Sequence, residues 1–305
     1  MDLNTLYHRT VECWADRVNA VHSDQWDDPT PCAGWTVRDL VNHVMGEDLW
    51  TAPLMRGRTI AAVGDRFDGD LLGDDPVTAA LDAAKQAVSV VAERLPRGEM
   101  VHLSFGDTDS AEYVRQLASD HLIHAWDLAA ATTGETRLDP QLVAEVARWF
   151  EGQEELMRSA GLIGPPASRS GDLQGDLLAA FGRDADWGSN HAVLMRFSAA
   201  FAARDVDRIM ALMTEDCVFE STSPAPDGVR HEGAEAVRRV WETLFTETND
   251  PVFTEEESLV CKDRAVVRWL FTWSEPDGTQ GHVRGVDLIA FRDGKVREKL
   301  SYVKG

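Results

Sequence analysis

The sequence predicts a multidomain protein in which an all-α helical bundle is followed by an α+β domain. Its 305 residues are enough for two domains of ordinary size. The first half repeats apolar residues at helical spacing, whereas the second half contains runs rich in β-branched and aromatic residues. Between them, residues 161–190 are rich in Gly, Pro, Ser and Asp, which favours a linker. We therefore place the two domains at residues 1–187 and 188–305.

Helical periodicity in the first domain is clearest near the N-terminus. Apolar residues recur at three- and four-residue steps in two segments, Val11, Trp14, Val18 and Val21, then Val37, Leu40, Val41 and Val44. Thr36 occupies the N-cap position of the second segment. Further helices are predicted at about 76–95, 110–132 and 139–159, and residues 161–190 are interpreted as a closing segment plus linker. Four or five helices without a strong strand pattern predict a bundle.

The second domain opens with helices and continues with strands. Helices are predicted at about 189–203, 209–213 and 234–245. The strand-like runs are CVFEST, VFTEEESLVC, AVVRWLFTW, HVRGVDLIAF and KVREKLSYV. Helices followed by a meandering antiparallel sheet are typical of an α+β domain.

Charge and cysteine content exclude several classes of function. The net charge of −22 would repel nucleic acid and anionic membrane surfaces. No apolar run is long enough to span a membrane and the N-terminus lacks the features of a signal peptide, so we expect a cytoplasmic protein. The four cysteines are widely scattered, which favours thiols over disulfides. Cys32, after a proline in a predicted loop, is either a reactive thiol or an ordinary packed cysteine.

The segment DHLIHAWDLA, residues 120–129, places polar groups on an apolar helical face. At about 100° per residue, the residues on one side of this helix are Tyr113, Leu117, Asp120, His124, Leu128 and Ala131. Burying an unpaired carboxylate costs several kcal/mol, so Asp120 needs a compensating partner. Four residues apart, the side chains of Asp120 and His124 project side by side.

Asp120 and His124 are spaced to bind one metal ion, with His43 as the best third ligand because it flanks the apolar stripe of the second helix. Two histidines and one carboxylate leave positions open for water or substrate, as in catalytic zinc sites. The alternative is a buried Asp–His hydrogen bond without metal. His121 and Asp127 are interpreted as outer-shell or surface groups, and Asp127 as a group that could orient a liganding imidazole.

Three motifs in the first domain support the metal hypothesis. TPCAGWTVRDLVNHVMG, DHLIHAWDLAAATTGE and LLAAFGRDADW together resemble the N-terminal metal-binding domain family of mycothiol-dependent maleylpyruvate isomerase, within the DinB-like four-helix bundles. The resemblance implies a metal, usually zinc, held by His43, Asp120 and His124, with Asp120 replacing the glutamate of the isomerase. It also implies activation of a low-molecular-weight thiol, typically mycothiol, because a coordinating cation deprotonates a thiol at neutral pH.

The second domain resembles the SnoaL-like group of the cone-shaped nuclear transport factor two fold. The resemblance rests on FAARDVDRIMALMTEDCVFES, RHEGAEAVRRVWETLF and VDLIAFRDGKV, and this fold hosts many unrelated functions. Ketosteroid isomerase shares the fold and offers a test of catalytic positions. Asp287 falls at the position of its oxyanion-holding aspartate, but Phe197 replaces its tyrosine and Ser221 its base. Ketosteroid isomerase chemistry is therefore not expected, and Asp287 remains the catalytic candidate.

Strand alternation suggests a pocket in the second domain. Val267, Trp269, Phe271 and Trp273 share one strand face, and Gly285, Asp287 and Ile289 share a face of the next strand. We name Trp269, Trp273 and Tyr302 as pocket residues, with His231 and Glu220 as weaker candidates. The alternative is a packed sheet face with Asp287 paired to an arginine such as Arg284 or Arg268.

Two hypotheses of different class follow. The first is a metalloenzyme that activates a thiol or water against a small organic electrophile. Its favoured reaction is thiol transfer or thiol-assisted isomerisation, and metal-assisted hydrolysis ranks second. The second is a small-molecule binding or sensing protein that uses the SnoaL-like pocket, or an isomerase, cyclase or hydrolase with its chemistry there. The expected partner is a small-molecule substrate, and domains of the second kind often pair through their sheets, so we expect a homodimer.

Overall fold

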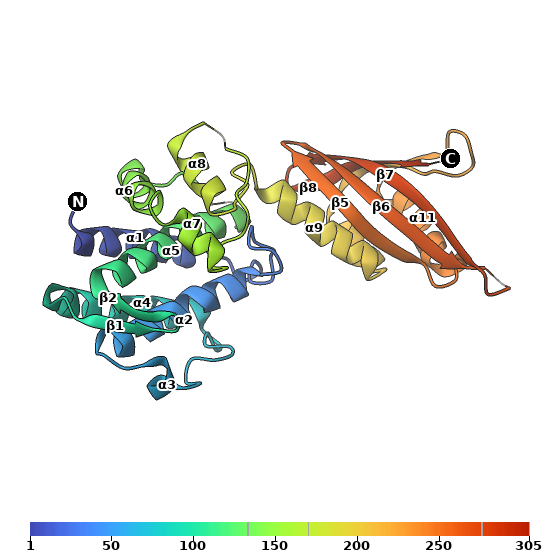
Figure 1. Cartoon of the computed structure of the whole chain (residues 1–305). Coiled ribbons are helices and arrows are strands. Elements are labelled where there is room, and N and C mark those ends of the chain that lie inside the picture. The colour runs from blue at the N-terminus through green and yellow to red at the C-terminus, as the bar shows by residue number, and fades with distance from the viewer. Residues whose placement is uncertain (133, 170, 276, 305) are drawn as a thin grey trace. The chain divides into compact units, whose positions relative to one another are not determined.

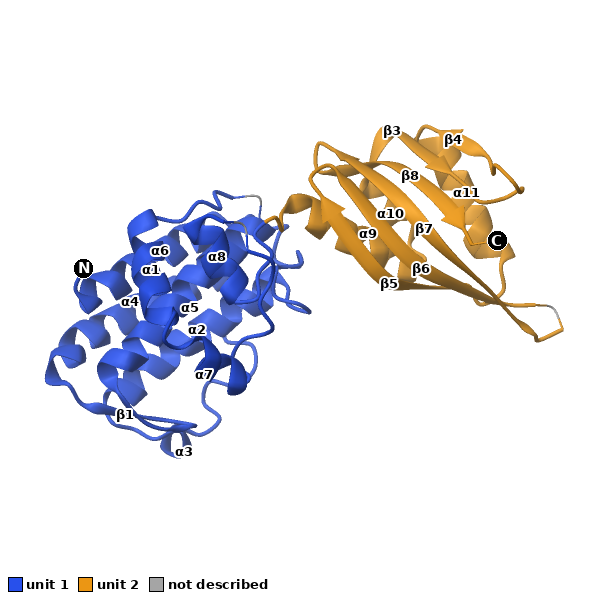
Figure 2. Ribbon diagram, turned by 45° about the horizontal axis from the view of Figure 1, so that its top comes forward, with its two compact units in different colours: residues 1–185 blue, residues 186–305 orange. Residues whose placement is uncertain are grey.

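The structure is a computed structural model that describes residues 1–132, 134–169, 171–275 and 277–304. The chain forms two compact units, Met1–Ala185 and Asp186–Gly305. Figure 1 labels the helices and strands, and Figure 2 colours the two units. The predicted fold class, a helical domain followed by an α+β domain, is confirmed.

Unit 1 is built around four long helices among its described residues. They are α1 (Leu3–Asn19), α2 (Val37–Met55), α4 (Pro76–Arg94) and α5 (Ser110–Ala131). Helix α1 packs against α4 and α5, and α2 packs against the same two helices, so the four form a bundle (Figure 2). The apolar stripe predicted for α2 lies in the bundle core, where Val37, Leu40, Val41 and Val44 are fully buried.

The shorter helices and strands of unit 1 differ in part from those predicted from the sequence. A hairpin of β1 (Met100–Leu103) and β2 (Gly106–Asp109) precedes α5, beside the one-turn helices α3 (Ile60–Val63) and η1 (Leu95–Arg97). Its four-residue strands are too short to reveal alternation in the sequence. The predicted helix at 139–159 is two helices, α6 (Pro140–Phe150) and α7 (Glu154–Ser159), which the turn at Gly152 separates. The apolar cluster of the predicted closing segment forms α8 (Leu173–Ala180), packed on α6.

Unit 2 contains three helices and a sheet in its described part. The helices are α9 (Ser189–Ala202), α10 (Val206–Ala211) and α11 (Ala234–Glu247). The strands are β3 (Met213–Glu220), β4 (Arg230–Glu232), β5 (Val252–Cys261), β6 (Arg264–Ser274), β7 (Gln280–Arg292) and β8 (Lys295–Val303), in the order β4-β3-β8-β7-β6-β5.

The sheet of unit 2 is mixed, so the predicted purely antiparallel meander is wrong in one respect. Strands β5 to β8 do form an antiparallel meander, but β3 pairs with β8 in parallel. The two strands are remote in the chain, and no local pattern encodes their relative direction. The helices pack on one face of the sheet, around a core that includes Phe197, Trp241 and Trp269 (Figure 2).

Among the described residues, no helix combines the length and the apolar character that a membrane span requires.

Candidate functional site

Helix α2 of unit 1 positions His43. The Thr36 side chain accepts a hydrogen bond from the Asp39 amide, and the Asp39 carboxylate accepts one from the Thr36 amide, so a capping box sets the start of the helix. The buried stripe of α2 then fixes the rotation of the helix. His43 lies at the edge of this stripe, and 33% of its side chain is exposed.

Helix α5 supplies the other two residues of the cluster. The Asp109 side chain caps its first turn by accepting a hydrogen bond from the Ala111 amide. Its second half is buried on nearly all sides, so Asp120 and His124 lie against the bundle rather than in open solvent. The His124 side chain is 8% exposed and that of Asp120 is 31% exposed.

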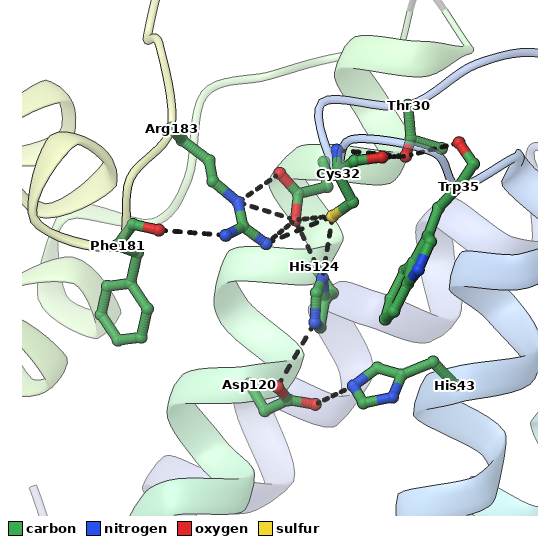
Figure 3. A network of polar contacts seen from close by, with 9 residues as sticks. Thr30, Cys32, Trp35, His43, Asp120, His124, Phe181 and Arg183 are labelled. Atoms are coloured by element: carbon green, nitrogen blue, oxygen red, sulfur yellow. Dashed lines mark hydrogen bonds and ion pairs between the residues drawn. The ribbon is translucent and has the colours of Figure 1, made fainter. Parts of the chain in front are cut away.

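The three predicted metal ligands lie together in the structure (Figure 3). His124 Nε2 is 3.3 Å from Asp120 Oδ1, and His43 Nε2 is 3.7 Å from Asp120 Oδ2. One ligand atom from each residue falls within 4.8 Å of the other two. Asp120 Oδ2 is buried and has no hydrogen-bond partner among the described residues. A carboxylate that faces one imidazole with each oxygen, and has one buried oxygen without a hydrogen bond, is a group that a divalent cation would satisfy.

Asp127 orients the imidazole of His124. His124 Nδ1 lies 2.8 Å from Asp127 Oδ2, and the fully buried carboxylate can only accept, so Nδ1 donates. The Nε2 atom is thereby directed at Asp120. Arg183 holds Asp127 in turn, with its Nη2 atom 2.9 Å from Asp127 Oδ2. The interpretation of Asp127 as a group that orients a histidine agrees with these contacts.

The indole of Trp35 covers the two imidazoles from the loop before α2 (Figure 3). Its ring centroid is 4.9 Å from that of His43 and 6.2 Å from that of His124. An aromatic cover of this kind restricts the rotation of both histidines and limits the access of water to them.

The charges in the cluster shift the pKa values of its members. Burial alone would lower the pKa of His124, but the Asp120 carboxylate and hydrogen bonds to Asp120, Asp127 and Cys32 raise it well above its ordinary value. Burial likewise would raise the pKa of Asp120, and the imidazoles of His124 and His43 bring it well below its ordinary range. Without a metal, the two residues therefore form an ion pair.

Cys32, His124 and Asp127 form a second group that overlaps the first at His124. Cys32 Sγ is 3.3 Å from Asp127 Oδ2 and 3.2 Å from Arg183 Nη2. The ligand atoms of this second group are already engaged, because Arg183 neutralises Asp127 and His124 Nδ1 donates to it. The first group, in which one buried Asp120 oxygen accepts no hydrogen bond, is the better candidate for a metal centre.

A cavity of about 670 Å³ opens onto the cluster. His43, Asp120 and His124 line it together with Cys32 and Arg183, and its other walls are mostly apolar, from Trp35, Trp50, Leu54, Tyr113, Ile123, Met157, Leu162 and Phe181. Glu47, one helical turn after His43, also lines it. Burial and the Asp120 carboxylate raise the pKa of Glu47, which makes it a group that can hold a proton near the cluster.

His121 lies in the bundle core rather than at the surface. Its side chain and that of Asp48 are both fully buried, with His121 Nε2 3.2 Å from Asp48 Oδ1. His121 Nδ1 lies 2.8 Å from the Leu117 carbonyl oxygen, to which it donates. Burial alone would lower the pKa of His121, but the Asp48 carboxylate raises it above its ordinary value. The alternative that His121 is a surface group is wrong.

In unit 2, the predicted catalytic candidate Asp287 pairs with a lysine. Lys299 Nζ lies 2.8 Å from Asp287 Oδ2, and both side chains are more than nine-tenths buried. The alternative partners Arg268 and Arg284 pair instead with glutamates of β5. Their side chains point to the opposite face of the sheet from Asp287, so the alternative of an arginine partner is wrong.

The predicted pocket residues of unit 2 do not all meet. Trp269 and His231 line a cavity of about 670 Å³. Trp273 stands near the end of the β6–β7 hairpin, where its indole N–H donates to Glu275. Tyr302 is half exposed on the other sheet face, because alternation along β8 turns Lys299 and Ser301 inward.

The other positions considered in unit 2 fall at its cavities or its edge. Glu220 lies 3.7 Å from Arg230 at the sheet edge. Ser221 lines the larger cavity, and Phe197 lines a smaller one beside it. None of these three contacts Asp287 in the hydrogen bonds and ion pairs of the described residues.

Sequence reasoning missed Glu47, Arg183 and Lys299. Glu47 follows His43 by four residues, a spacing that predicts a shared helical face, so a helical projection would have found it. Arg183 stands inside the LLAAFGRDADW motif, but its contact with Asp127 spans 56 residues and has no local signal. Lys299 and Asp287 are on neighbouring strands, and their contact depends on the register of β7 with β8.

Two families match separate parts of the chain. Residues 7–129 match the family described as Mycothiol maleylpyruvate isomerase N-terminal domain. Residues 194–299 match the family described as SnoaL-like domain. The chain is also similar to the uncharacterized proteins Rv0738 and MT0763 of two Mycobacterium tuberculosis strains. Each is 32% identical over 174 residues, which cover 54% of this chain and 81% of the relative.

Solved structures resemble about a third of the chain. A protein of the nuclear transport factor two type from Mesorhizobium loti, of unknown function, is 38% identical, covers 38% of this chain and 92% of its own, and has a TM-score of 0.34. A protein described as a putative polyketide cyclase from Xanthomonas campestris is 15% identical, with coverage of 38% and 90% and a TM-score of 0.34.

Proposed function

We propose a metal-dependent enzymatic function for this chain, which belongs to the mycothiol maleylpyruvate isomerase N-terminal domain family and carries a SnoaL-like domain at residues 194–299. A divalent cation, zinc in the first place, is held by His43, Asp120 and His124. The reaction is transfer of a low-molecular-weight thiol, with mycothiol as the leading candidate, to a small organic electrophile, or the thiol-assisted isomerisation of that electrophile. Metal-assisted hydrolysis ranks second.

The observation that supports this proposal is the buried Asp120 oxygen that accepts no hydrogen bond among the described residues. A buried carboxylate oxygen without a hydrogen bond carries a desolvation cost of about 1–3 kcal/mol or more. The nitrogen atoms of His124 and His43 that face the two oxygens of Asp120 are themselves common metal ligands. Two nitrogen ligands and one oxygen ligand fit zinc, and the three residues that would hold it line the cavity.

The cation, when bound, would lower the pKa of a coordinated thiol and make it nucleophilic at neutral pH. The chain's own residues prepare that position. Asp127 holds His124 with Nε2 directed at Asp120, and Arg183 keeps Asp127 charged in the buried site. The indole of Trp35 packs against both imidazoles, and mostly apolar side chains form the other walls of the cavity. Glu47 is placed to take up the thiol proton or return a proton to the product.

The first prediction concerns thiol consumption. Zinc-loaded protein is expected to consume mycothiol and yield a conjugate or an isomer with at least one member of a panel holding maleylpyruvate, an epoxide and an aryl chloride. His43→Ala is expected to reduce the rate by about 100-fold or more, because a metal ligand is lost. Chromatography of the thiol and its products measures the rate.

His8→Ala is the matched control, since His8 is half exposed on α1 and remote in sequence from the cluster, and it should retain the full rate. A rate that is the same in the wild type, in His43→Ala and in chelator-treated protein would contradict the proposal.

A second prediction concerns protons released on metal binding. The raised pKa of His124 means that a proton occupies Nε2 near neutral pH, and zinc must displace it. We expect roughly one proton to be released per zinc ion at pH 7, and zinc affinity to fall as the pH is lowered. Calorimetric titration in two buffers with different ionisation enthalpies measures the number of protons. Binding without proton release would show that His124 carries no displaceable proton at pH 7.

A second candidate function is binding of a small molecule in unit 2, without turnover in unit 1. The specific observation that favours it is the cavity of about 670 Å³ beneath the sheet, whose walls combine aromatic rings with polar side chains. The two candidates are separable. If no electrophile yields a thiol conjugate while tight ligand binding persists in His124→Ala, the binding function replaces the enzymatic one.

A further inference from the structure

The cavity of unit 1 extends away from the candidate metal centre along helix α2. After His43, the cavity is lined by Glu47, Trp50 and Leu54 of the same helix. Steps of three and four residues keep these side chains on one helical face. Eleven residues of helix, from His43 to Leu54, span about 16 Å. This wall therefore continues well beyond the metal ligands.

Helix α5 forms a second wall that leads in the same direction. Leu117 and Tyr113 precede Asp120 by three and seven residues, and both line the cavity. Helices α2 and α5 pack against each other. Thr59, after α2, forms a bridge with His102 of β1, before α5, so the end of α2 and the start of α5 lie at the same end of unit 1. The wall of α5 covers about 10 Å from Asp120 to Tyr113.

The residues that border this far end of the cavity carry no charge. Ile60 of α3 and Leu103 and Phe105 of the β1–β2 hairpin contribute apolar side chains there, and the polar residues are Ser104 and Gln116. Ile60 is 37% exposed and Phe105 is 62% exposed. Exposed apolar side chains beside a cavity are typical of a site where an apolar group binds.

Few charged side chains of the described residues line the cavity apart from the candidate metal ligands. They are Glu47, which is acidic, and Arg183. The guanidinium of Arg183 is already paired, because Nε lies 3.1 Å from Asp127 Oδ1 and Nη2 lies 2.9 Å from Asp127 Oδ2. Its Nη1 atom donates to the Phe181 carbonyl oxygen at 3.0 Å. The positive charge of Arg183 is therefore compensated within the protein.

The charges of a loaded centre would also be balanced. The two positive charges of a zinc ion would be offset by the Asp120 carboxylate and by a coordinated thiolate. A carboxylate on the second reactant would then enter the cavity without a cation to pair with, and it would lose its hydration there.

We infer that the electrophile of the proposed reaction is uncharged and carries an extended apolar group, which lies between α2 and α5 along Trp50, Leu54 and Tyr113. The cavity thus selects against a dicarboxylate such as maleylpyruvate. The inference rests on the proposed metal-dependent function and names the class of its substrate.

The test measures binding rather than turnover, with three hydroxamates that share one metal-binding head group. Octanohydroxamate has an apolar tail, acetohydroxamate has almost none, and the monohydroxamate of octanedioic acid has a tail that ends in a carboxylate. Calorimetric titration of the zinc-loaded full chain gives the affinities. Chelator-treated chain is the reference for binding outside the metal centre.

Octanohydroxamate should bind at least about 100-fold more tightly than acetohydroxamate, because each buried CH₂ group increases affinity about fourfold. It should also bind at least about tenfold more tightly than the carboxylate compound, since that carboxylate would be desolvated without a partner.

Two tryptophan variants locate the apolar tail. Trp50→Ala should reduce the preference for octanohydroxamate over acetohydroxamate by about tenfold and leave the affinity for acetohydroxamate unchanged, because only the tail reaches Trp50. Trp187→Ala is the matched control, since Trp187 is also half-buried but lies in unit 2, and it should keep the full preference. The wild-type comparison decides the matter even where Trp50→Ala does not fold.

Each other outcome overturns a defined part of the argument. Equal affinities for octanohydroxamate and acetohydroxamate, or a preference that Trp50→Ala leaves intact, would remove the apolar group from this wall while the metal-dependent function stands. Equal or tighter binding of the carboxylate compound would contradict an uncharged electrophile. If no hydroxamate binds to the zinc-loaded chain more tightly than to the chelator-treated chain, the metal centre and the inference both fall.

Discussion

Replacing Asp120 with alanine is expected to abolish metal binding by the full chain. The wild type, prepared without chelator, should contain about one zinc ion per chain, and Asp120→Ala less than about a tenth of that, because structural and catalytic sites need their complete ligand set. Asp120 is the central residue of the cluster, since one of its oxygens faces His124 and the other faces His43. Elemental analysis of the purified proteins measures the content.

Two variants make this experiment specific. Cys32→Ala removes one member of the overlapping group of Cys32, His124 and Asp127, and it should retain the metal. Asp82→Ala, an exposed carboxylate on α4, controls for the loss of a negative charge. Loss of metal in Cys32→Ala with retention in Asp120→Ala would assign the metal to the overlapping group. A wild type that is free of metal and does not bind added zinc would contradict the metal centre altogether.

The second large effect is expected from the buried pair of His121 and Asp48. His121→Leu leaves the fully buried Asp48 carboxylate without its partner, which typically costs about 3–5 kcal/mol of the free energy of unfolding. Replacing both residues with leucine should recover most of the loss, because no unpaired charge remains. Urea denaturation of chelator-treated protein, followed by helical circular dichroism, measures the free energies.

His8→Leu, on the exposed face of α1, should change the free energy by less than about 0.5 kcal/mol and serves as the control. A His121→Leu variant as stable as the wild type would show that the burial of Asp48 does not depend on His121.

The same pair predicts how stability depends on pH. The pKa of His121 is raised in the folded protein, so its contribution is fully present below the unfolded value of about 6.5 and is lost as the pH rises through the folded value. The stability difference between the wild type and the double leucine variant should therefore decline with increasing pH above about 6.5. This comparison cancels the titration of His124, which both proteins share.

Much of the fold was predictable because its signals are short-range. The apolar stripe of α2, the capping box at Thr36 and the alternation along β6 each follow from the geometry of one element. The break between α6 and α7 and the short hairpin before α5 gave weaker signals, because few residues form them. The parallel pairing of β3 with β8 gave none, since it joins the first and last strands of unit 2.

The same distinction between local and long-range signals decides which features of the candidate site could be predicted from the sequence. The spacing of Asp120 and His124 could be interpreted from the sequence because the pitch of a helix places residues four apart side by side. The partners of these residues that are distant in sequence depend on how the helices and strands pack. Arg183 reaches Asp127 across 56 residues, His121 finds Asp48 on another helix, and the register of β7 with β8 gives Asp287 a lysine instead of an arginine. Local backbone geometry is encoded within a few residues, whereas long-range partners are chosen by the folded chain as a whole.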